Sequence, residues 1–187
     1  MGSMHVEAIN IGPTEALAPV GSVAAVAGKG LVGDRHFTDS PPPGNALTLI
    51  EAEVLEDVGL TGAQSRRQVV VRGVRVNDLI GKRFRIGDVE CLGVEICEPC
   101  VHLQRMTRPG IIKDLLHRGG LNADILSGGT ISVGDEISFL FVRTGGGVSP
   151  RSPRLYEWPM SPGLSDGGEP RFASRFLFQT MIVNVWK

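Results

Sequence analysis

The sequence predicts a mostly β protein whose strands form a closed or partly open β-barrel with a few short helices. Most apolar segments are short and rich in valine and isoleucine, and glycine-containing turns separate them. Few stretches show the periodicity of a helix. Because many short strands accompany few helices, we expect the sheet to close on itself.

The expected strands follow one another along most of the chain. They are His5–Ile11, Val20–Ala27, Gln68–Arg72, Arg83–Ile86, Val89–Ile96, Asn122–Leu126 and Glu136–Val142. Two connections share a pattern, since Gly87-Asp88 and Gly134-Asp135 each stand between strand-like runs, as tight turns between paired strands require. We therefore expect both turns to be hairpins of the barrel.

A first helix is expected to begin near Thr48 and to end at Gly59. The four residues from Thr48 to Glu51 have the spacing of a capping box, and Gly59 is suited to end the helix. Between them runs one apolar stripe, made of Ile50, Val54, Leu55 and Val58.

A second, shorter helix is expected beyond the cysteines. Pro109 suits a first helical turn, and Gly119 offers a C-terminal cap. Its narrow apolar face consists of Ile111, Ile112, Leu115 and Leu116. Because this helix follows the cysteine loop closely, we expect it to form a wall of the site.

Composition limits both the architecture and the function. A chain of 187 residues, 42% hydrophobic and 21% charged, can bury one sizeable core. The net charge of -1 gives no global attraction for nucleic acid or an anionic membrane. Three cysteines do not make a disulfide framework, and no apolar run approaches the roughly 20 residues that span a bilayer. With no secretory signal, we expect a cytoplasmic protein that binds neither nucleic acid nor membranes.

The character of the chain changes near Thr144. Six of the ten aromatic residues lie beyond this point, together with a cluster of prolines and glycines. We therefore predict a barrel domain over residues 1–143 and a Pro- and Gly-rich aromatic extension over residues 144–187 that is partly irregular.

The chemistry is expected where the strand Val89–Ile96 ends. One face of this strand is apolar and predicts a half-buried, rigid run; its residues are Leu92, Val94 and Ile96. Cys100 follows in the exit loop, with His102 and Arg105 close by in the sequence. Because basic neighbours lower the pKa of a thiol, we expect Cys100 to be reactive.

A second motif is the glycine-rich run GLVGDRHF, residues 30–37. Its glycines allow close turns, Asp34 can fix a neighbouring arginine or amide, and Arg35 and His36 supply donors for a phosphate or another oxyanion. The run lacks the Gly-Lys-Ser/Thr ending of a P-loop, so nucleotide hydrolysis is not indicated. Arg66 and Arg67 precede a predicted strand, and we expect the barrel to bring one of them beside Arg35.

Taken in order, these motifs resemble the MOSC domain, named for the C-terminal domain of molybdenum cofactor sulfurase. The resemblance covers roughly Val6 to Val142 and rests on GLVGDRHF, the helix after LTLIE, RRQVVVRGVRVNDLIGKRFRIGDVECLGVEICEPC and GGLNADILSGGTISVGDEI. It implies a compact, barrel-like β fold. It also implies binding of the molybdenum cofactor (molybdopterin) or metal–sulfur chemistry, with a cysteine as sulfur carrier or metal ligand.

The resemblance also implies a set of site residues. Cys100 matches the family's cysteine, and Arg67 matches the basic position before the central strand. Gln68 is a departure, because the family pattern often has asparagine there. We expect catalytic roles for Cys100, His36 and His102, and a metal-ligand role for Cys100. The expected cofactor-binding residues are Gly33, Asp34, Arg35, Arg67 and Gln68.

Two classes of function remain open at this point. In an enzyme or sulfur carrier, Cys100 carries a persulfide or ligates molybdenum, the Arg35 and Arg67 region holds the cofactor phosphate, and His36 or His102 moves a proton. In a binding module, the same pocket holds the cofactor or another anion and Cys100 only anchors it. The expected partners are a small-molecule cofactor or sulfur-bearing substrate and a separate sulfur donor or molybdoenzyme.

Structural interpretations of the same residues also remain open. Cys91 and Cys97 fit as small core residues, and Arg35 and His36 fit as supports of a tight turn. A redox pair of Cys97 with Cys100 and a structural zinc site of Cys97, Cys100 and His102 are further alternatives.

Overall fold

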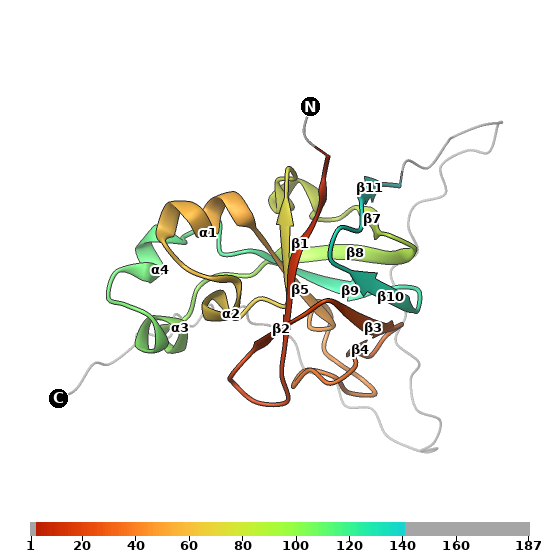
Figure 1. Cartoon of the computed structure of the whole chain (residues 1–187), viewed down its shortest axis with the longest axis horizontal. Helices are drawn as coiled ribbons and strands as arrows, with labels where there is room; N and C mark the ends of the chain where they lie inside the picture. Colours follow the sequence, from red (N-terminus) through yellow and green to blue (C-terminus); the bar gives the residue numbers. More distant parts are fainter. Residues whose placement is uncertain (1–2, 141–187) are drawn as a thin grey trace, which may run out of the picture. The chain divides into compact units, whose positions relative to one another are not determined.

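The computed structural model describes residues 3–140 of the chain (Figure 1). In this part, eight strands form one sheet in the order β11-β7-β8-β9-β5-β6-β1-β2, and three form a second in the order β10-β3-β4. The strands are β1 His5–Ile11, β2 Ala18–Val20, β3 Ser22–Val26, β4 Gly30–Leu31, β5 Leu47–Glu51, β6 Val69–Arg72, β7 Arg83–Ile86, β8 Val89–Ile96, β9 Leu121–Ile125, β10 Gly129–Ser132 and β11 Ile137–Phe139. The helices are α1 Ala52–Val58, α2 Gly62–Ser65, the 3-10 helix η1 Val76–Leu79, α3 Val101–Met106 and α4 Ile111–Asp114.

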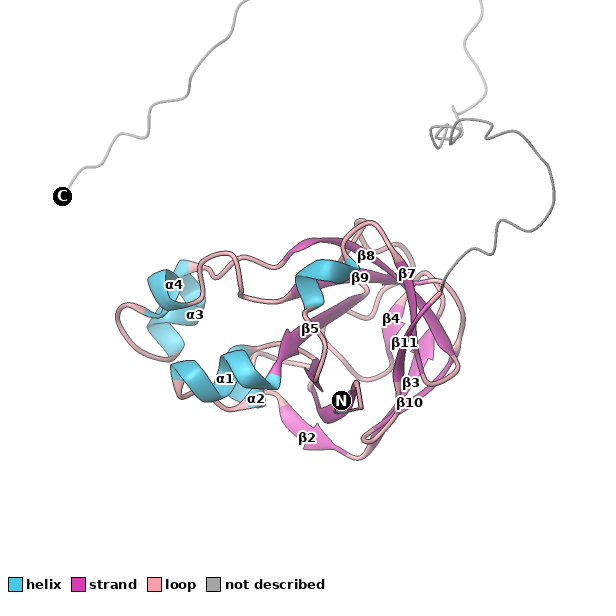
Figure 2. Ribbon diagram, turned by 90° about the horizontal axis from the view of Figure 1, so that it is seen from above, coloured by secondary structure: helices cyan, strands magenta, loops and turns pink. Residues whose placement is uncertain are grey.

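The large sheet curls until β1 meets the segment that leads into β11. His5 and Glu136 form an isolated bridge, and the N–H of Val6 donates to the carbonyl of Asp135 at 2.9 Å. Seen from above, the strands surround the interior and the four α-helices gather on one side (Figure 2). The predicted mostly β, barrel-like fold with few short helices is therefore confirmed.

Side chains that alternate along the strands fill the interior of the barrel. In β7, Phe84 and Ile86 are fully buried, whereas Arg83 and Arg85 are exposed, as alternation across a sheet requires. β8 is half-buried as expected, with Leu92, Val94 and Ile96 partly buried on one face, but the face that packs into the core is the other one, made of Val89, Cys91 and Gly93. Small residues are needed on that inner face, since a Cβ on Gly93 would lie 2.2 Å from the carbonyl oxygen of Leu79.

The first predicted helix is wrong in its first part. Residues Leu47–Glu51 form β5, and α1 begins only at Ala52. β5 lies between β9 and β6 in the sheet, with the barrel core on one face and α1 against the other, so its apolar residues are buried on both sides. A strand buried on both faces reads as a continuous apolar run and not as an alternating one. The predicted end at Gly59 is confirmed by its φ of 69° and its N–H bond to the carbonyl of Glu56.

The second predicted helix is shorter than expected. α4 ends at Asp114, so Gly119 is not its cap, and Leu116 points to solvent. The sequence did not predict α3, which is too short to show an apolar stripe. α1, α3 and α4 share one apolar cluster, made of Val54, Val58, Leu103, Ile111 and Leu115.

Most predicted strands are present, and three have the predicted bounds, namely β1, β7 and β8. β2, β4, β5 and β10 were not predicted. The Gly87-Asp88 hairpin is confirmed, because β7 pairs with β8. The Gly134-Asp135 hairpin is wrong: β10 pairs with β3 and β11 with β7, so this turn carries the chain from one sheet to the other.

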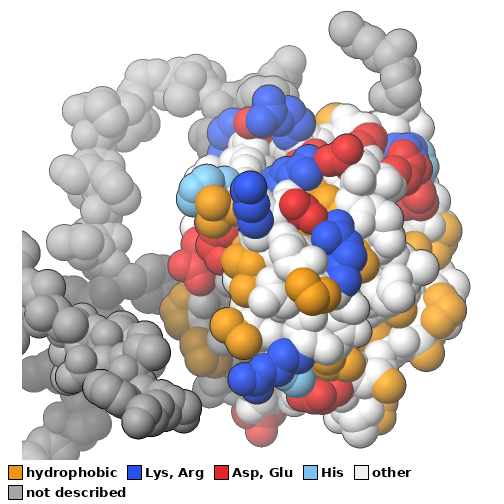
Figure 3. All heavy atoms as spheres, turned by 90° about the vertical axis from the view of Figure 1, so that its left-hand side faces the viewer, with side chains coloured by type: hydrophobic (Ala, Val, Ile, Leu, Met, Phe, Trp, Pro, Cys, Tyr) orange, Lys and Arg blue, Asp and Glu red, His pale blue; other side chains and the backbone are white. Residues whose placement is uncertain are grey.

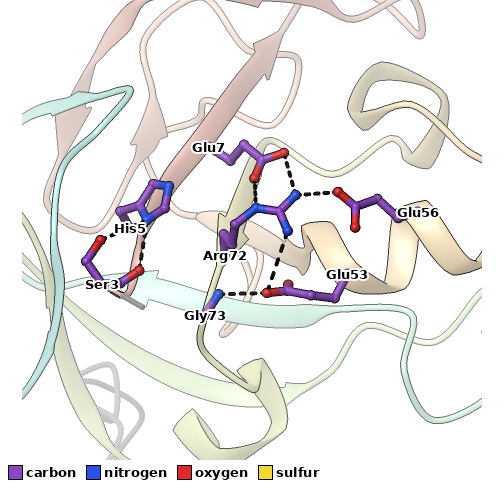
Figure 4. A network of polar contacts seen from close by, with 7 residues as sticks. All are labelled: Ser3, His5, Glu7, Glu53, Glu56, Arg72 and Gly73. Atoms are coloured by element: carbon purple, nitrogen blue, oxygen red, sulfur yellow. Dashed lines mark hydrogen bonds and ion pairs between the residues drawn. The ribbon is translucent and has the colours of Figure 1, made fainter. Parts of the chain in front are cut away.

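Charged side chains connect the outer surface of the barrel with the helical side. Arg72 of β6 contacts Glu7 of β1 and both Glu53 and Glu56 of α1 (Figure 4). The hydrogen bonds that the Arg72 guanidinium donates to Glu7 and Glu56 raise its pKa above the ordinary value. On the helical side, apolar side chains show between basic and acidic ones (Figure 3).

Two further expectations concern the limits of the domain and membranes. The predicted extension, residues 144–187, and the end of the predicted strand at Val142 lie outside the described residues. The domain boundary near residue 143 therefore stays a prediction. Between residues 3 and 140, no helix is long and apolar enough to cross a membrane.

Candidate functional site

A pocket of about 230 Å³ lies over four strands that are consecutive in the large sheet, β8, β9, β5 and β6. The residues that line it come from the loop after β4, the start of β5, the turn before β6, the exit of β8 and the start of β9. They are Arg35, His36, Asn45, Thr48, Arg66, Arg67, Cys97, Glu98, Cys100 and Asn122. The barrel thus brings both predicted motifs to one place, although they are more than 60 residues apart.

Arg67 is buried beneath the pocket and fixed by backbone carbonyls. Its Nε donates to Gly119 at 2.8 Å, its Nη2 to Cys97 at 3.1 Å and its Nη1 to Ser65 at 3.3 Å. Gly120 allows this close approach, because its φ is 119° and a Cβ there would lie 2.3 Å from the carbonyl oxygen of Leu49. Arg67 therefore joins the exit of β8 to the starts of β6 and β9, and its orientation is set.

Two more arginines reach the pocket from its rim. Arg35 is half-buried and donates from Nη1 to the carbonyl of Thr14 at 3.3 Å. Arg66 ends α2 with a φ of 64°, an uncommon conformation for a non-glycine residue, and its side chain lies 3.9 Å from Glu15. Burial lowers the pKa of Arg35, and so does repulsion from Arg66. The pocket is therefore electropositive, although the whole chain is nearly neutral.

Asp34 and Gln68 support the pocket from behind and do not line it. Gln68 Nε2 donates to Asp34 Oδ1 at 2.7 Å, and Gln68 Oε1 accepts from the N–H of Thr48 at 2.8 Å. Asp34 Oδ1 also accepts from the backbone N–H of His36 at 2.9 Å. Burial alone would raise the pKa of Asp34, but these hydrogen bonds outweigh burial and hold the pKa below its usual value.

The two candidate proton-transfer histidines have different surroundings. His36 lines the pocket, and its Nδ1 lies 3.2 Å from the buried Asp34 Oδ1, so its other ring nitrogen is left for exchange with a ligand. His102 does not line the pocket. Its Nε2 lies 3.1 Å from Glu15 Oε1 in an ion pair whose angles do not make a hydrogen bond.

The three cysteines are free and differ in exposure. Cys91 is fully buried in the barrel core, and burial raises its thiol pKa to about 12. Cys97 is half-buried in the pocket wall, and burial raises its pKa as well. Cys100 is exposed at the start of α3, where its sulfur accepts the N–H of Leu103 at 3.4 Å. Cys100 is therefore the thiol that both solvent and a pocket ligand can reach.

The predicted site residues thus fall into two groups. Cys100, His36, Arg35 and Arg67 meet around the pocket. The other four do not line it: Gly33, Asp34, Gln68 and His102. Gly33 has a φ of 85°, which fits the turn predicted for the glycine-rich run.

Sequence reasoning missed several features of the pocket. Arg66 was expected only as an alternative to Arg67, yet both line the pocket, and the pair of adjacent arginines was the available signal. The role of Gly119 and Gly120 was also missed, because their contacts with Cys97 and Leu49 are far apart in the sequence. Among residues 3–140, no group of three or more histidine, cysteine or acidic side chains is placed to hold a metal, so the zinc alternative has no support.

The described residues thus form a curled, mostly β barrel with an arginine-lined pocket that also contains an exposed thiol. The chain belongs to the MOSC domain family, whose model matches residues 45–138, about half of its length. MOSC domains are associated with binding of the molybdenum cofactor.

Solved structures share this fold at low sequence identity. The YuaD protein from Bacillus subtilis is 16% identical with a TM-score of 0.64, and the match covers 74% of this chain and 96% of that one. YiiM from Geobacillus stearothermophilus is 17% identical with a TM-score of 0.58, covering 76% and 77% of the two chains. YiiM from Escherichia coli is 16% identical with a TM-score of 0.54, covering 73% and 69%. No curated protein sequence matches the chain.

Proposed function

We propose that this MOSC protein is a sulfur carrier in which Cys100 takes up a sulfur atom as a persulfide beside a pocket that holds an anionic group. The observation that carries this proposal is that Cys100 lines the same pocket as Arg35, Arg66 and Arg67. A thiol is a nucleophile and a soft ligand, whereas guanidinium groups bind phosphate and other oxyanions. The pocket thus combines a thiol that can accept sulfur with arginines that can bind an anion.

The surrounding residues would support the transfer. Cys100 attacks as the thiolate, and the N–H of Leu103 donates to its sulfur. His36 is the residue that would accept or return a proton at the pocket wall, since Asp34 holds its Nδ1 side. His102 is paired with Glu15 and takes no part in this proposal.

The arginine and cysteine side chains of the pocket are also suited to bind part of the molybdenum cofactor. Arg35 and Arg67 would hold its phosphate, and the Cys100 thiol is a ligand type that molybdenum accepts. When bound, this cofactor supplies a redox-active metal. The pocket, at about 230 Å³, is smaller than the roughly 300 to 1,000 Å³ of sites that enclose drug-sized ligands. It is large enough to enclose the phosphate.

Persulfide loading tests the sulfur-carrier proposal. The full chain is incubated with a cysteine desulfurase and cysteine, and the peptide that contains Cys100 is mapped by mass spectrometry. We expect one additional sulfur atom on Cys100, none anywhere in Cys100→Ser, and unchanged loading in Cys91→Ser. Loading that survives in Cys100→Ser would contradict the proposal.

A binding module without sulfur chemistry is the second candidate, and the arginine cluster favours it independently of the thiol. In that case wild-type protein would take up no sulfur, and Cys100→Ser would bind the cofactor or phosphate as tightly as wild type in a calorimetric titration.

A further inference from the structure

The basic pocket contains more positive charge than its own carboxylates balance. Within residues 3–140, neither Arg35 nor Arg67 forms an ion pair, and Arg66 has only Glu15, at 3.9 Å. Glu98 lies in the pocket wall, but its carboxylate is paired with His117 Nδ1 at 2.8 Å and also accepts the N–H of that residue. Three guanidinium groups therefore face one small pocket with little compensation.

These guanidinium groups retain donors for a ligand. Arg67 has five N–H groups and gives three hydrogen bonds to backbone carbonyls, so two remain. Arg35 gives one bond, to Thr14. Burial and repulsion from Arg66 lower the pKa of Arg35, and attraction from Asp34 and Glu15 offsets this only in part, so a bound dianion would favour the charged guanidinium.

The size of the pocket selects among anions. A volume of about 230 Å³ is small for a nucleotide or a whole pterin cofactor but ample for a tetrahedral oxyanion. Cys100 and Cys97 share this pocket, so an oxyanion held by the arginines lies in the same cavity as a thiol. Cys100 is the exposed thiol of the two.

We propose that the pocket binds small dianionic oxyanions that carry a transferable sulfur atom, of which thiosulfate is the simplest, and that Cys100 takes the sulfur from them. The arginines hold the sulfonate end, and the outer sulfur faces Cys100. This inference rests on the proposed function, because it requires the Cys100 persulfide, and it names the class of donor that fills the site.

The reaction balances without an added oxidant. The Cys100 thiolate attacks the outer sulfur of thiosulfate, a sulfur–sulfur bond forms, and the bond between the two thiosulfate sulfurs breaks. Sulfite leaves with the bonding electron pair. One thiolate and one thiosulfate dianion thus give one persulfide anion and one sulfite dianion, so atoms and charge are conserved. The arginines stabilise the sulfonate that becomes the leaving group.

The test compares two sulfur donors on the full, reduced chain. Thiosulfate carries the oxyanion group, whereas inorganic polysulfide carries transferable sulfur without it. We expect thiosulfate to release one sulfite for each persulfide formed on Cys100, and Cys100→Ser to release none. Sulfate, which has the same tetrahedral end, should slow the reaction with thiosulfate much more than the reaction with polysulfide.

Arginine variants measure how much the pocket arginines contribute to the rate of loading from thiosulfate. Because Arg67 also holds three backbone segments, the test uses Arg35→Gln and Arg66→Gln, with Arg85→Gln on the remote strand β7 as the charge-matched control. Loss of one charge-assisted contact should slow loading from thiosulfate by about 10- to 100-fold. Polysulfide is also an anion but has no sulfonate for the arginines to hold, so its loading should slow much less than that from thiosulfate, and Arg85→Gln should behave as wild type with both donors.

The outcomes separate this inference from the proposed function. If polysulfide or a desulfurase loads Cys100 but thiosulfate does not, the inference is wrong and the sulfur carrier stands. The same holds if thiosulfate loads Arg35→Gln and Arg66→Gln at the wild-type rate. If no donor loads Cys100, the sulfur-carrier proposal fails and this inference fails with it.

Discussion

Single residues set the chemistry of the pocket, and the three thiols show how. Cys91 lies in the barrel core, Cys97 lies in the pocket wall, and Cys100 begins α3 at the surface. Only the thiolate is a nucleophile, so burial suppresses reactivity both by excluding reagents and by raising the pKa. The sequence predicts a reactive sulfur at Cys100 from its basic neighbours, and the exposure of Cys100 in the structure is a second reason to expect it.

Alkylation should therefore distinguish the thiols. With iodoacetamide at about pH 8, Cys100 should be labelled first. Burial raises the pKa of Cys91 to about 12, which leaves it on the order of a thousandfold less thiolate than an ordinary cysteine. Peptide mapping over time measures the three rates. Equal labelling of Cys91 and Cys100 would contradict the assignment.

Asp34 should make stability depend on pH. Burial raises its pKa, but hydrogen bonds from His36 and Gln68 lower it more, so the folded-state pKa lies below the unfolded value of about 3.9. A lowered folded-state pKa stabilises the fold at pH values above the unfolded pKa. This stabilisation is lost as the pH falls through the folded-state pKa.

Asp34→Asn measures this contribution. At neutral pH we expect a loss of about 1.5 to 3 kcal/mol in the free energy of unfolding, as for a charge-assisted hydrogen bond. Urea unfolding between about pH 7 and pH 2 should show a smaller acid loss in the variant than in wild type. Asp88→Asn, in an exposed turn, is the control. An identical pH dependence for wild type and Asp34→Asn would refute the role of Asp34.

At the scale of elements, β8 positions the cysteine loop. A bulge between Gly93 and Glu95 shifts its register with β9, and Gly93 exchanges backbone hydrogen bonds with the residues after η1, donating to Lys82 and accepting from Gly81. β8 therefore leaves the sheet with the carbonyl of Cys97 facing Arg67.

Gly93→Ala should disturb this packing. The new Cβ would lie 2.2 Å from the carbonyl oxygen of Leu79, a backbone atom that cannot move aside. We expect a loss of about 1 to 3 kcal/mol, as for overpacked cores, measured by chemical denaturation. Gly21→Ala, with nothing within 4 Å of the new Cβ, is the control. Equal stability of the two variants would contradict the close contact.

At the scale of the whole molecule, one apolar cluster holds the barrel together. Its buried members run from Val6 to Ile137, and they come from both sheets. The backbone bonds between β1 and the segment before β11 close the curled sheet over this cluster. Both ends of the described chain are thus part of the fold.

A chain ended after Arg143 should consequently fold by itself. The predicted barrel domain, residues 1–143, contains the large apolar cluster that is seen among residues 3–140. We expect cooperative thermal unfolding with the midpoint of the full chain, followed by circular dichroism. Loss of cooperativity, or a midpoint lowered by more than about 2 to 4 °C, which corresponds to roughly 1 kcal/mol, would show that residues 144–187 stabilise the barrel.

Local sequence patterns by themselves determined the strands β1, β7 and β8, the hairpin at Gly87-Asp88, the glycine-rich turn and the exposed cysteine loop. Each of these depends on interactions between residues close in the sequence: alternation of apolar residues, turn chemistry, and basic neighbours. The family resemblance also predicted the barrel and placed Cys100 with Arg67.

Several features depend on residues that are far apart in the sequence, and only the tertiary structure decided them. Leu47–Glu51 is a strand because β9 and β6 flank it, although its apolar run reads equally well as a helix. Gln68 became a buried support of Asp34 because Thr48 occupies its carbonyl end. Arg66 joined the pocket because the chain turns at positive φ before β6. No local pattern encodes these partners, since burial and register are set by residues that meet only when the sheet has closed.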